Sequence, residues 1–247
     1  MKLQSVHTFP PNSPIKELNL SRGALSLAFA DLGDRLTSSR SAGASKRRAT
    51  AEGFNVFDFI APIENVLSDI LAFLLDPQES HGQGMLFLEK LLSRTCSKEA
   101  PILNRPVVAR ESLTYAIPNH RRRIDIQVTL PDFVLAIETK KFTDEGKNQV
   151  ADYCDHLSKI SGNQFCLVFL TLTGDAAVSI SAKAAAKLKQ EKRLICWSWE
   201  RDIPAWLEVC QLKCEAPKVR HFLEDFRTYI DKYLATQQPE EVDDEQE

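Results

Sequence analysis

Apolar residues recur along this chain in two patterns, which predict a mixture of strands and helices. Short apolar runs indicate strands, and apolar positions spaced three or four residues apart indicate amphipathic helices. Residues 121–140 (RRRIDIQVTLPDFVLAIETK) contain two apolar runs separated by a Leu-Pro-Asp break. We interpret this stretch as a β-hairpin around which the rest of the chain is organised.

The alternation of side chains along a strand predicts which residues of the hairpin share a face. In the second strand, Glu138 and Lys140 are expected on the same face, and if the strands pair, Asp125 can lie next to Glu138. In the first strand, Arg123 and Asp125 are expected to share one face. The aliphatic residues between and beyond them are expected to share the opposite face: Ile124, Ile126 and Val128.

The segments around the hairpin predict further helices and buried strands. A helical pattern begins at Pro62 and ends at Asp76, and a second helix is expected from Met85. Strands are predicted over residues 107–117, 165–173 and 194–199. Helices are predicted after Gln149, over residues 181–192, and in two segments of the carboxyl-terminal part. This order predicts an α/β fold with a central mixed sheet flanked by helices.

Composition predicts three parts in the chain. Residues 1–53 are expected to form an irregular or helical amino-terminal extension, residues 54–236 the main domain, and residues 237–247 a disordered acidic tail. The last eight residues hold six acids and no base, whereas the whole chain has a net charge of only −3. The rest of the chain is therefore mildly basic, which permits a nucleic-acid partner without requiring one.

The six cysteines form no Cys-x-x-Cys motif and several lie in apolar patterns, so we expect buried free thiols in a reducing cytoplasm. The amino terminus lacks the apolar core of a signal peptide. No apolar run approaches the ~20 residues that a membrane span requires. The expectation is a cytoplasmic protein without a membrane partner.

Two carboxylates at the end of a buried strand pair are energetically unfavourable unless their charges are compensated. Asp125 and Glu138 would have to share a proton, meet a cationic side chain, or bind a hard cation such as Mg²⁺. Lys140 can reach the same point. Carboxylates that hold a metal and a lysine that positions water suit phosphodiester hydrolysis. An ordinary cluster of Asp, Glu and Lys at a sheet end is the alternative for so short a pattern.

Taken in order, Ile124-Asp125, then Glu138-Thr139-Lys140, then Gln149 with Tyr153, resemble the motifs of the PD-(D/E)XK nuclease superfamily, which is restriction-endonuclease-like. The run also resembles one bacterial branch, in which a glutamate-bearing helix precedes RRIDI, IExK and QxxxY. The resemblance covers roughly residues 57–234. One departure is Ile124, which replaces the proline of the namesake motif.

The resemblance implies a restriction-endonuclease-like core and a role for each motif residue. Mg²⁺ (or Mn²⁺) would be held by Asp125, Glu138 and the backbone carbonyl of Thr139. Lys140 would orient or deprotonate the attacking water, and the products would carry 5′-phosphate and 3′-hydroxyl ends. The implied catalytic residues are Glu64, Asp125, Glu138, Lys140 and Gln149.

Three further residues are candidates for substrate binding, each with an alternative. Arg123 shares the predicted face of Asp125 and could contact phosphate or compensate the acids. Tyr153 could equally be a core residue with its hydroxyl tied to the site, and His81 a turn histidine bonded to nearby backbone.

For Glu64, position alone favours a helix-start acid, whereas the resemblance implies a third acid beside the metal.

The expected function is a metal-dependent nuclease that acts on DNA, in bacterial defence or a mobile element. Two alternatives stay open: a catalytically silent nucleic-acid-binding or protein-interaction module on the same fold, and an RNA-directed nuclease. A homodimer or an activating partner protein is compatible with these expectations. The chain lacks a glycine-rich phosphate loop, His/Cys metal spacing and a Gly-x-Ser-x-Gly elbow, which argues against nucleotide-driven motors, zinc fingers and serine hydrolases.

Overall fold

The structure of the chain is a computed structural model. It describes residues 31–32, 35, 38–39, 45–96, 106–117, 122–141 and 144–235. The chain separates into two units, Met1–Phe54 and Asn55–Glu247. Within the first unit residues 45–50 are helical, while the predicted acidic tail lies outside the described residues.

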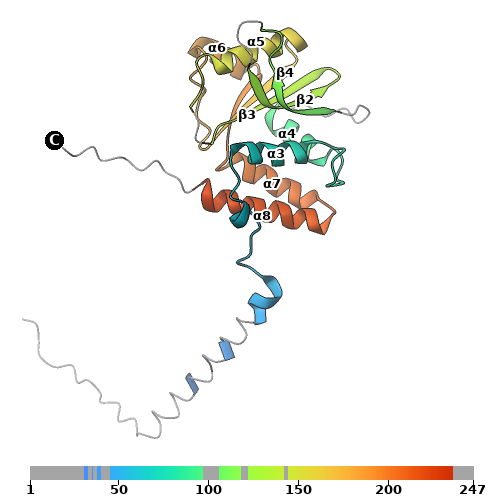
Figure 1. The fold of residues 1–247 in the computed structure, drawn as a ribbon, viewed down its shortest axis with the longest axis vertical. Coiled ribbons are helices and arrows are strands. Elements are labelled where there is room, and N and C mark those ends of the chain that lie inside the picture. Colours follow the sequence, from blue (N-terminus) through green and yellow to red (C-terminus); the bar gives the residue numbers. More distant parts are fainter. Residues whose placement is uncertain are drawn as a thin grey trace, which may run out of the picture. The chain divides into compact units, whose positions relative to one another are not determined.

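A five-stranded mixed sheet forms the centre of the second unit, with the strand order β1-β2-β3-β4-β5 (Figure 1). Strands β1, β2 and β3 pair antiparallel, whereas β3, β4 and β5 pair parallel. The predicted hairpin is therefore the β2–β3 pair. The strands are β1 (Val107–Leu113), β2 (Arg123–Leu130), β3 (Phe133–Thr139), β4 (Phe165–Thr171) and β5 (Leu194–Ser198).

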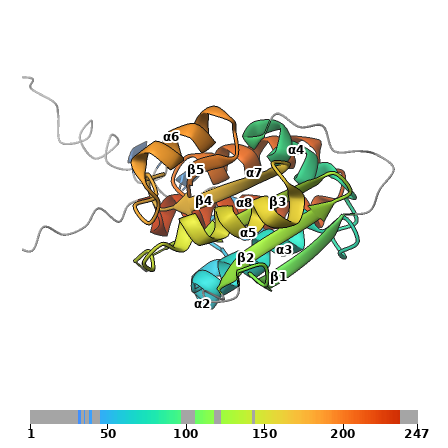
Figure 2. The ribbon, with the colours of Figure 1, turned by 90° about the horizontal axis from the view of Figure 1, so that it is seen from above.

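Helices cover both faces of the sheet, which confirms the predicted α/β fold with a central mixed sheet. Helices α5 and α6 lie on one face, and α3, α4, α7 and α8 lie on the other (Figures 1 and 2). Each face has its own apolar core. The helices are α2 (Phe57–Ile60), α3 (Glu64–Leu75), α4 (Leu86–Thr95), α5 (Gln149–Ser161), α6 (Ala182–Gln190), α7 (Asp202–Lys213) and α8 (Pro217–Tyr233).

Strands β3 and β4 are apolar on both faces because helices cover each of them from both sides. In β2 the alternation changes direction at Asp125. Ile126 packs in the core beside α3, whereas Ile124 packs in the core beside α5, so the prediction that they share a face is wrong. The pairing of β1 with β2 is interrupted at this point, where Glu111 has a left-handed φ of 48°.

Several predicted boundaries differ from the structure by one to four residues, and two of these differences have a clear local cause. Helix α3 begins at Glu64 rather than at Pro62, because Ile63 is extended and serves as the residue before the helix. Strand β1 ends at Leu113 rather than at residue 117, because Thr114 turns away and its hydroxyl accepts the backbone N–H of Arg122.

The six cysteines form no disulfide among the described residues, as predicted, and all but Cys196 are buried. Within the part of the chain that the structure describes, no helix combines the length and the hydropathy that crossing a membrane demands.

Candidate active site

The two central acids meet where strands β2 and β3 separate. The last paired residues of the hairpin at this end are Ile126 and Ile137, so Asp125 and Glu138 are the next residues on the two strands. Beyond that pair, the backbone N–H of Thr139 donates to Oδ2 of Asp125 at 2.7 Å. The side chain of Asp125 thus accepts a backbone N–H at the end of the ladder.

Glu138 is a buried carboxyl whose two oxygens have different surroundings. Its exposed fraction is 3%, and Oε1 accepts a hydrogen bond of 2.6 Å from Nε2 of Gln149. The same oxygen lies 3.2 Å from Nζ of Lys140. Oε2 is buried and has no hydrogen-bond partner among the residues that the structure describes. The structure therefore brings together Glu138, Lys140 and Gln149 and leaves one carboxyl oxygen unpaired.

Burial raises the pKa of Glu138 from its usual 4.5 to about 8, and the nearby charge of Asp125 adds to the rise. Lys140 opposes the shift but does not cancel it. Desolvation penalises the charged carboxylate more than one ammonium group compensates. At neutral pH the site therefore needs either a proton on Glu138 or a further positive charge.

A divalent cation would supply that charge, and the available donors suit a hard metal ion. Oε2 of Glu138 is unpaired, and Oδ1 of Asp125 takes part in no hydrogen bond with the described residues. In the described ranges, no group of three His, Cys, Asp or Glu side chains could hold a metal. Two carboxylates and a backbone carbonyl, completed by water, fit Mg²⁺ or Mn²⁺, because Mg²⁺ usually retains several waters.

Helix α5 places Gln149 and Tyr153 at the site, one turn apart on the same face. The Gln149 amide is fixed at both ends, because its Oε1 accepts from the N–H of Gly146 and its Nε2 donates to Glu138 and to Oη of Tyr153. Tyr153 is buried, and its hydroxyl donates to the carbonyl of Arg123 at 2.7 Å. The structure therefore places Tyr153 behind Gln149, where it supports the amide.

Glu64 lies at the border of the site, as the first residue of α3. Its Oε2 accepts the backbone N–H of Lys141 at 2.7 Å, which ties the start of the helix to the chain just after Lys140. Nζ of Lys141 donates to the carbonyl of Pro62 at 3.2 Å, and burial lowers the pKa of Lys141 while Glu64 opposes the shift. Both contacts join the start of α3 to the end of β3.

Arg123 lies beside the site but does not bond to its acids. Its guanidinium pairs with Glu111 of β1 at 3.0 Å, and 67% of its side chain is exposed. The expectation that it compensates the acids is therefore wrong, because Glu111 binds its guanidinium. Because the Arg123 side chain is exposed, it is accessible to a phosphate group, and the expected contact with phosphate stays a prediction.

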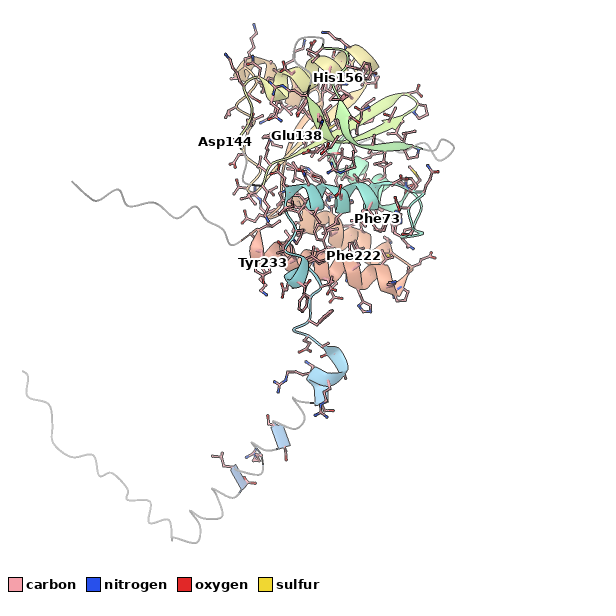
Figure 3. The ribbon with its side chains drawn as sticks, viewed as in Figure 1. Phe73, Glu138, Asp144, His156, Phe222 and Tyr233 are labelled. Atoms are coloured by element: carbon pink, nitrogen blue, oxygen red, sulfur yellow. The ribbon has the colours of Figure 1, made fainter. Side chains whose placement is uncertain are left out.

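His81 lies away from the site, contrary to its predicted role in substrate binding. It is 3% exposed, its Nδ1 accepts the N–H of Gln83, and its Nε2 lies 2.8 Å from the carbonyl of Asp76. Asp76 follows the last residue of α3, about 18 Å from the helix start at Glu64. The ring packs edge-on against Phe73, which lies in the helical layer away from Glu138 (Figure 3). His81 is thus the turn histidine of the alternative interpretation.

Two residues of the site were not among the sequence predictions. Ser68 of α3 lies 2.7 Å from the hydroxyl of Thr139, and its position four residues after Glu64 on a helix was a signal for a shared face. Arg110 of β1 donates to the backbone carbonyls of Asp125 and Asn65. No local pattern distinguishes Arg110 from an exposed strand residue.

Comparison with known proteins gives one match for this region. A family model described as the PD-(D/E)XK nuclease superfamily matches residues 54–228. No curated protein and no solved structure matches the chain. The matched range includes the sheet and every residue of the site described above.

Proposed function

This chain belongs to the PD-(D/E)XK nuclease superfamily, and on that premise we propose that it is a metal-dependent nuclease that hydrolyses phosphodiester bonds in DNA. The observation that carries the proposal is the unpaired Oε2 of Glu138, a buried carboxyl oxygen for which the described residues provide no partner. It belongs to a carboxyl that already contacts Lys140 and faces Asp125 across the open end of the hairpin. Such an oxygen is suited to a cation.

In the proposed mechanism, Asp125, Glu138 and the backbone carbonyl of Thr139 would hold Mg²⁺ or Mn²⁺. The bound ion would polarise the scissile phosphate and stabilise its developing charge. Lys140 orients or deprotonates the attacking water from its position 3.2 Å from Glu138. Gln149 holds Oε1 of Glu138, which leaves Oε2 for the cation. Glu64 holds the chain after Lys140 and could reach the ion through water.

The choice of DNA, and of a role in bacterial defence or a mobile element, rests on the resemblance of the motif order. The mildly basic composition outside the acidic tail and the exposed guanidinium of Arg123 are compatible with a phosphate backbone. RNA would present the same phosphate chemistry, so the substrate panel in the test below includes it.

The test compares the wild type with Lys140→Ala on plasmid, linear and single-stranded DNA and on RNA, with Mg²⁺, Mn²⁺ or EDTA. We expect metal-dependent cleavage of DNA by the wild type and a loss of about 10²–10⁴-fold in the variant, the usual contribution of a group that transfers or positions a proton. Lys159→Ala is the matched control, because it removes an exposed lysine of α5 whose ion pair, among the described residues, is with Asp155. It should cleave like the wild type.

Cleavage by Lys140→Ala at the rate of the wild type would overturn the assignment of Lys140. A second measurement separates the nuclease from a catalytically silent module on the same fold. A protein that binds Mg²⁺ or Mn²⁺ gains melting temperature with either ion. The absence of both cleavage and this gain would refute the proposed function.

A further inference from the structure

Thr139 occupies the variable position between the acid and the lysine of the motif, and its side chain is fully buried. We infer that its hydroxyl, together with Ser68 of α3, is a positioning device that fixes the carboxylate of Asp125 for metal binding. This inference rests on the proposed function, and it adds two residues that contact neither the metal nor the substrate directly through their side chains.

Thr139 engages one oxygen of Asp125 twice. Its backbone N–H donates to Oδ2 at 2.7 Å, and its hydroxyl donates to the same Oδ2 at 2.8 Å. Rotation of the carboxylate would break both hydrogen bonds. The contact therefore commits Oδ2 to Thr139 and leaves Oδ1 as the oxygen that can bind a cation.

The direction of the hydrogen bonds follows from the number of protons. A hydroxyl has a single hydrogen, and the hydroxyl of Thr139 uses it on Asp125, because an ionised carboxylate can only accept. In the 2.7 Å contact between Ser68 and Thr139, Ser68 must then be the donor. The result is a one-way chain from Ser68 through Thr139 to Asp125, in which each hydrogen bond polarises the next.

The surroundings of these hydrogen bonds between Ser68, Thr139 and Asp125 make them rigid. Ser68 and Thr139 are 1% and 0% exposed, so water does not compete for either hydroxyl. A buried serine inside a helix can bond to the carbonyl four residues earlier, but here its hydroxyl lies at hydrogen-bond distance from the sheet. Ser68 lies on the apolar side of α3, between Leu67 and Leu71. The packing of that helix therefore fixes Ser68, the first donor in this series of hydrogen bonds.

Asp125 is also held through its backbone. Nη1 of Arg110 donates to the carbonyl of Asp125, and Nη2 of the same guanidinium donates to the carbonyl of Asn65 in α3. The main chain and the carboxylate of Asp125 are thus each connected to α3. Partners of this kind, which orient a metal ligand, typically change metal affinity by 10–100-fold when they are lost.

The test measures Mn²⁺ binding by titration calorimetry on the metal-free full chain, without nucleic acid. Thr139→Val keeps the shape of the side chain and removes its hydroxyl, and we expect its Kd for Mn²⁺ to rise about 10-fold or more. Thr139→Ser keeps the hydroxyl and should bind Mn²⁺ like the wild type. Ser68→Ala should raise Kd less, because Thr139 can still donate to Asp125.

The double variant Ser68→Ala/Thr139→Val distinguishes positioning from independent structural effects. If Ser68 acts only through Thr139, the double variant should bind Mn²⁺ as weakly as Thr139→Val alone. Cleavage by Thr139→Val should recover at high metal concentration, since the reacting groups remain. Melting temperature without metal gives the structural effect separately.

One outcome concerns a wild type that binds Mn²⁺ and cleaves. If Thr139→Val then binds Mn²⁺ with the same Kd, this inference is overturned and the proposed function is left intact. An equal loss of affinity in Thr139→Ser would also overturn it, because the hydroxyl would then not be the cause. Failure of the wild type itself to bind Mn²⁺ and to cleave would overturn the proposed function, and the inference with it.

Discussion

Glu138 combines deep burial with a position beside a second acid, and these two features oppose ionisation. Its pKa of about 8 means that the metal-free protein holds a proton on this carboxyl at neutral pH. A neutral carboxyl removes the repulsion with Asp125 that a bound cation would otherwise offset. Under the proposed function, a bound cation would take over this compensation at a pH where Glu138 is ionised.

This shift predicts that the metal-free protein becomes less stable as pH rises. The pKa of Glu138 is about 8 in the folded protein, against a usual value of 4.5. Above pH 4.5 the carboxyl is ionised in the unfolded chain but still protonated in the folded protein. The free energy of unfolding therefore falls steadily as pH rises from 4.5 to about 8, and the fall ends there. The slope from one such group is at most about 1.4 kcal/mol per pH unit.

The measurement is urea unfolding in EDTA between pH 5 and about 9, for the wild type and Glu138→Gln. Glutamine mimics the protonated acid and can still accept from Lys140 and Gln149 through its carbonyl. We expect the stability advantage of the variant to grow with pH across this window and then to level off. A difference that does not change with pH would contradict the raised pKa.

At the scale of elements, α3 connects the strands that carry the site. In its first two turns, Ser68 contacts β3 and Glu64 contacts Lys141 just after β3, while Asn65 and Asp69 contact β1. These four positions lie on adjacent rows of one helix surface. The opposite side of the hairpin is held by α5, whose Tyr153 donates to a carbonyl of β2.

The guanidinium of Arg110 is the central part of the connection between α3 and β2, and we predict that its loss is more harmful than the loss of its ion-pair partner. Arg110→Met removes the donors to the carbonyls of Asp125 and Asn65 as well as the 2.7 Å contact with Asp69. Hydrogen bonds to charged groups contribute about 1.5–3 kcal/mol. We expect a destabilisation of that order in chemical unfolding.

The matched variant is Asp69→Ala, which removes only the ion pair. The Asp69 side chain is 63% exposed, and exposed pairs are worth about 0–1 kcal/mol. Its effect on unfolding should therefore be within about 1 kcal/mol of the wild type. Equal effects of the two variants would mean that the bonds to the carbonyls contribute nothing.

At the scale of the molecule, the second unit begins at a residue that is itself anchored. Asn55 is buried, its Nδ2 donates to the carbonyl of Asp225 in α8, and its Oδ1 accepts the N–H of Phe57. The ring of Phe57 then packs against Phe222 and Phe226 of the same helix. These contacts join the start of the unit to α8.

This arrangement predicts that the chain can be shortened to Asn55 but not much further. A variant of residues 55–247 should keep its fold, with a melting temperature within about 2–4 °C of the full chain, which corresponds to about 1 kcal/mol. A variant that starts at residue 58 loses Asn55 and Phe57. It should be destabilised by about 3–5 kcal/mol, as for removal of a buried aromatic side chain.

Thermal unfolding followed by circular dichroism would measure both truncations. A drop of 10 °C or more in the variant that starts at Asn55 would show that residues 1–54 stabilise the second unit. Equal melting temperatures for the two truncations would instead contradict the anchoring role of Phe57.

The sequence by itself determined the order of the elements and the centre of the site. Apolar periodicity is a local property, so the strands and helices were recognisable within short windows. Asp125 and Glu138 belong to one hairpin, and the short turn between their strands fixes which residues come opposite each other. Lys140 was expected beside Glu138 because alternate residues of a strand share a face, and the structure has it there.

The tertiary structure alone decided the surroundings of that centre. Ser68 meets Thr139 across 71 positions of sequence, and Glu64 meets the backbone of Lys141 across 77. No local pattern encodes such pairs, because they depend on how α3 packs on the sheet. Glu138 likewise depends on a distant element, because it is buried beside Gln149 of α5, and that burial raises its pKa. Periodicity and register are set by neighbours in the chain, whereas burial and partners are set by whichever distant elements the folded core brings together.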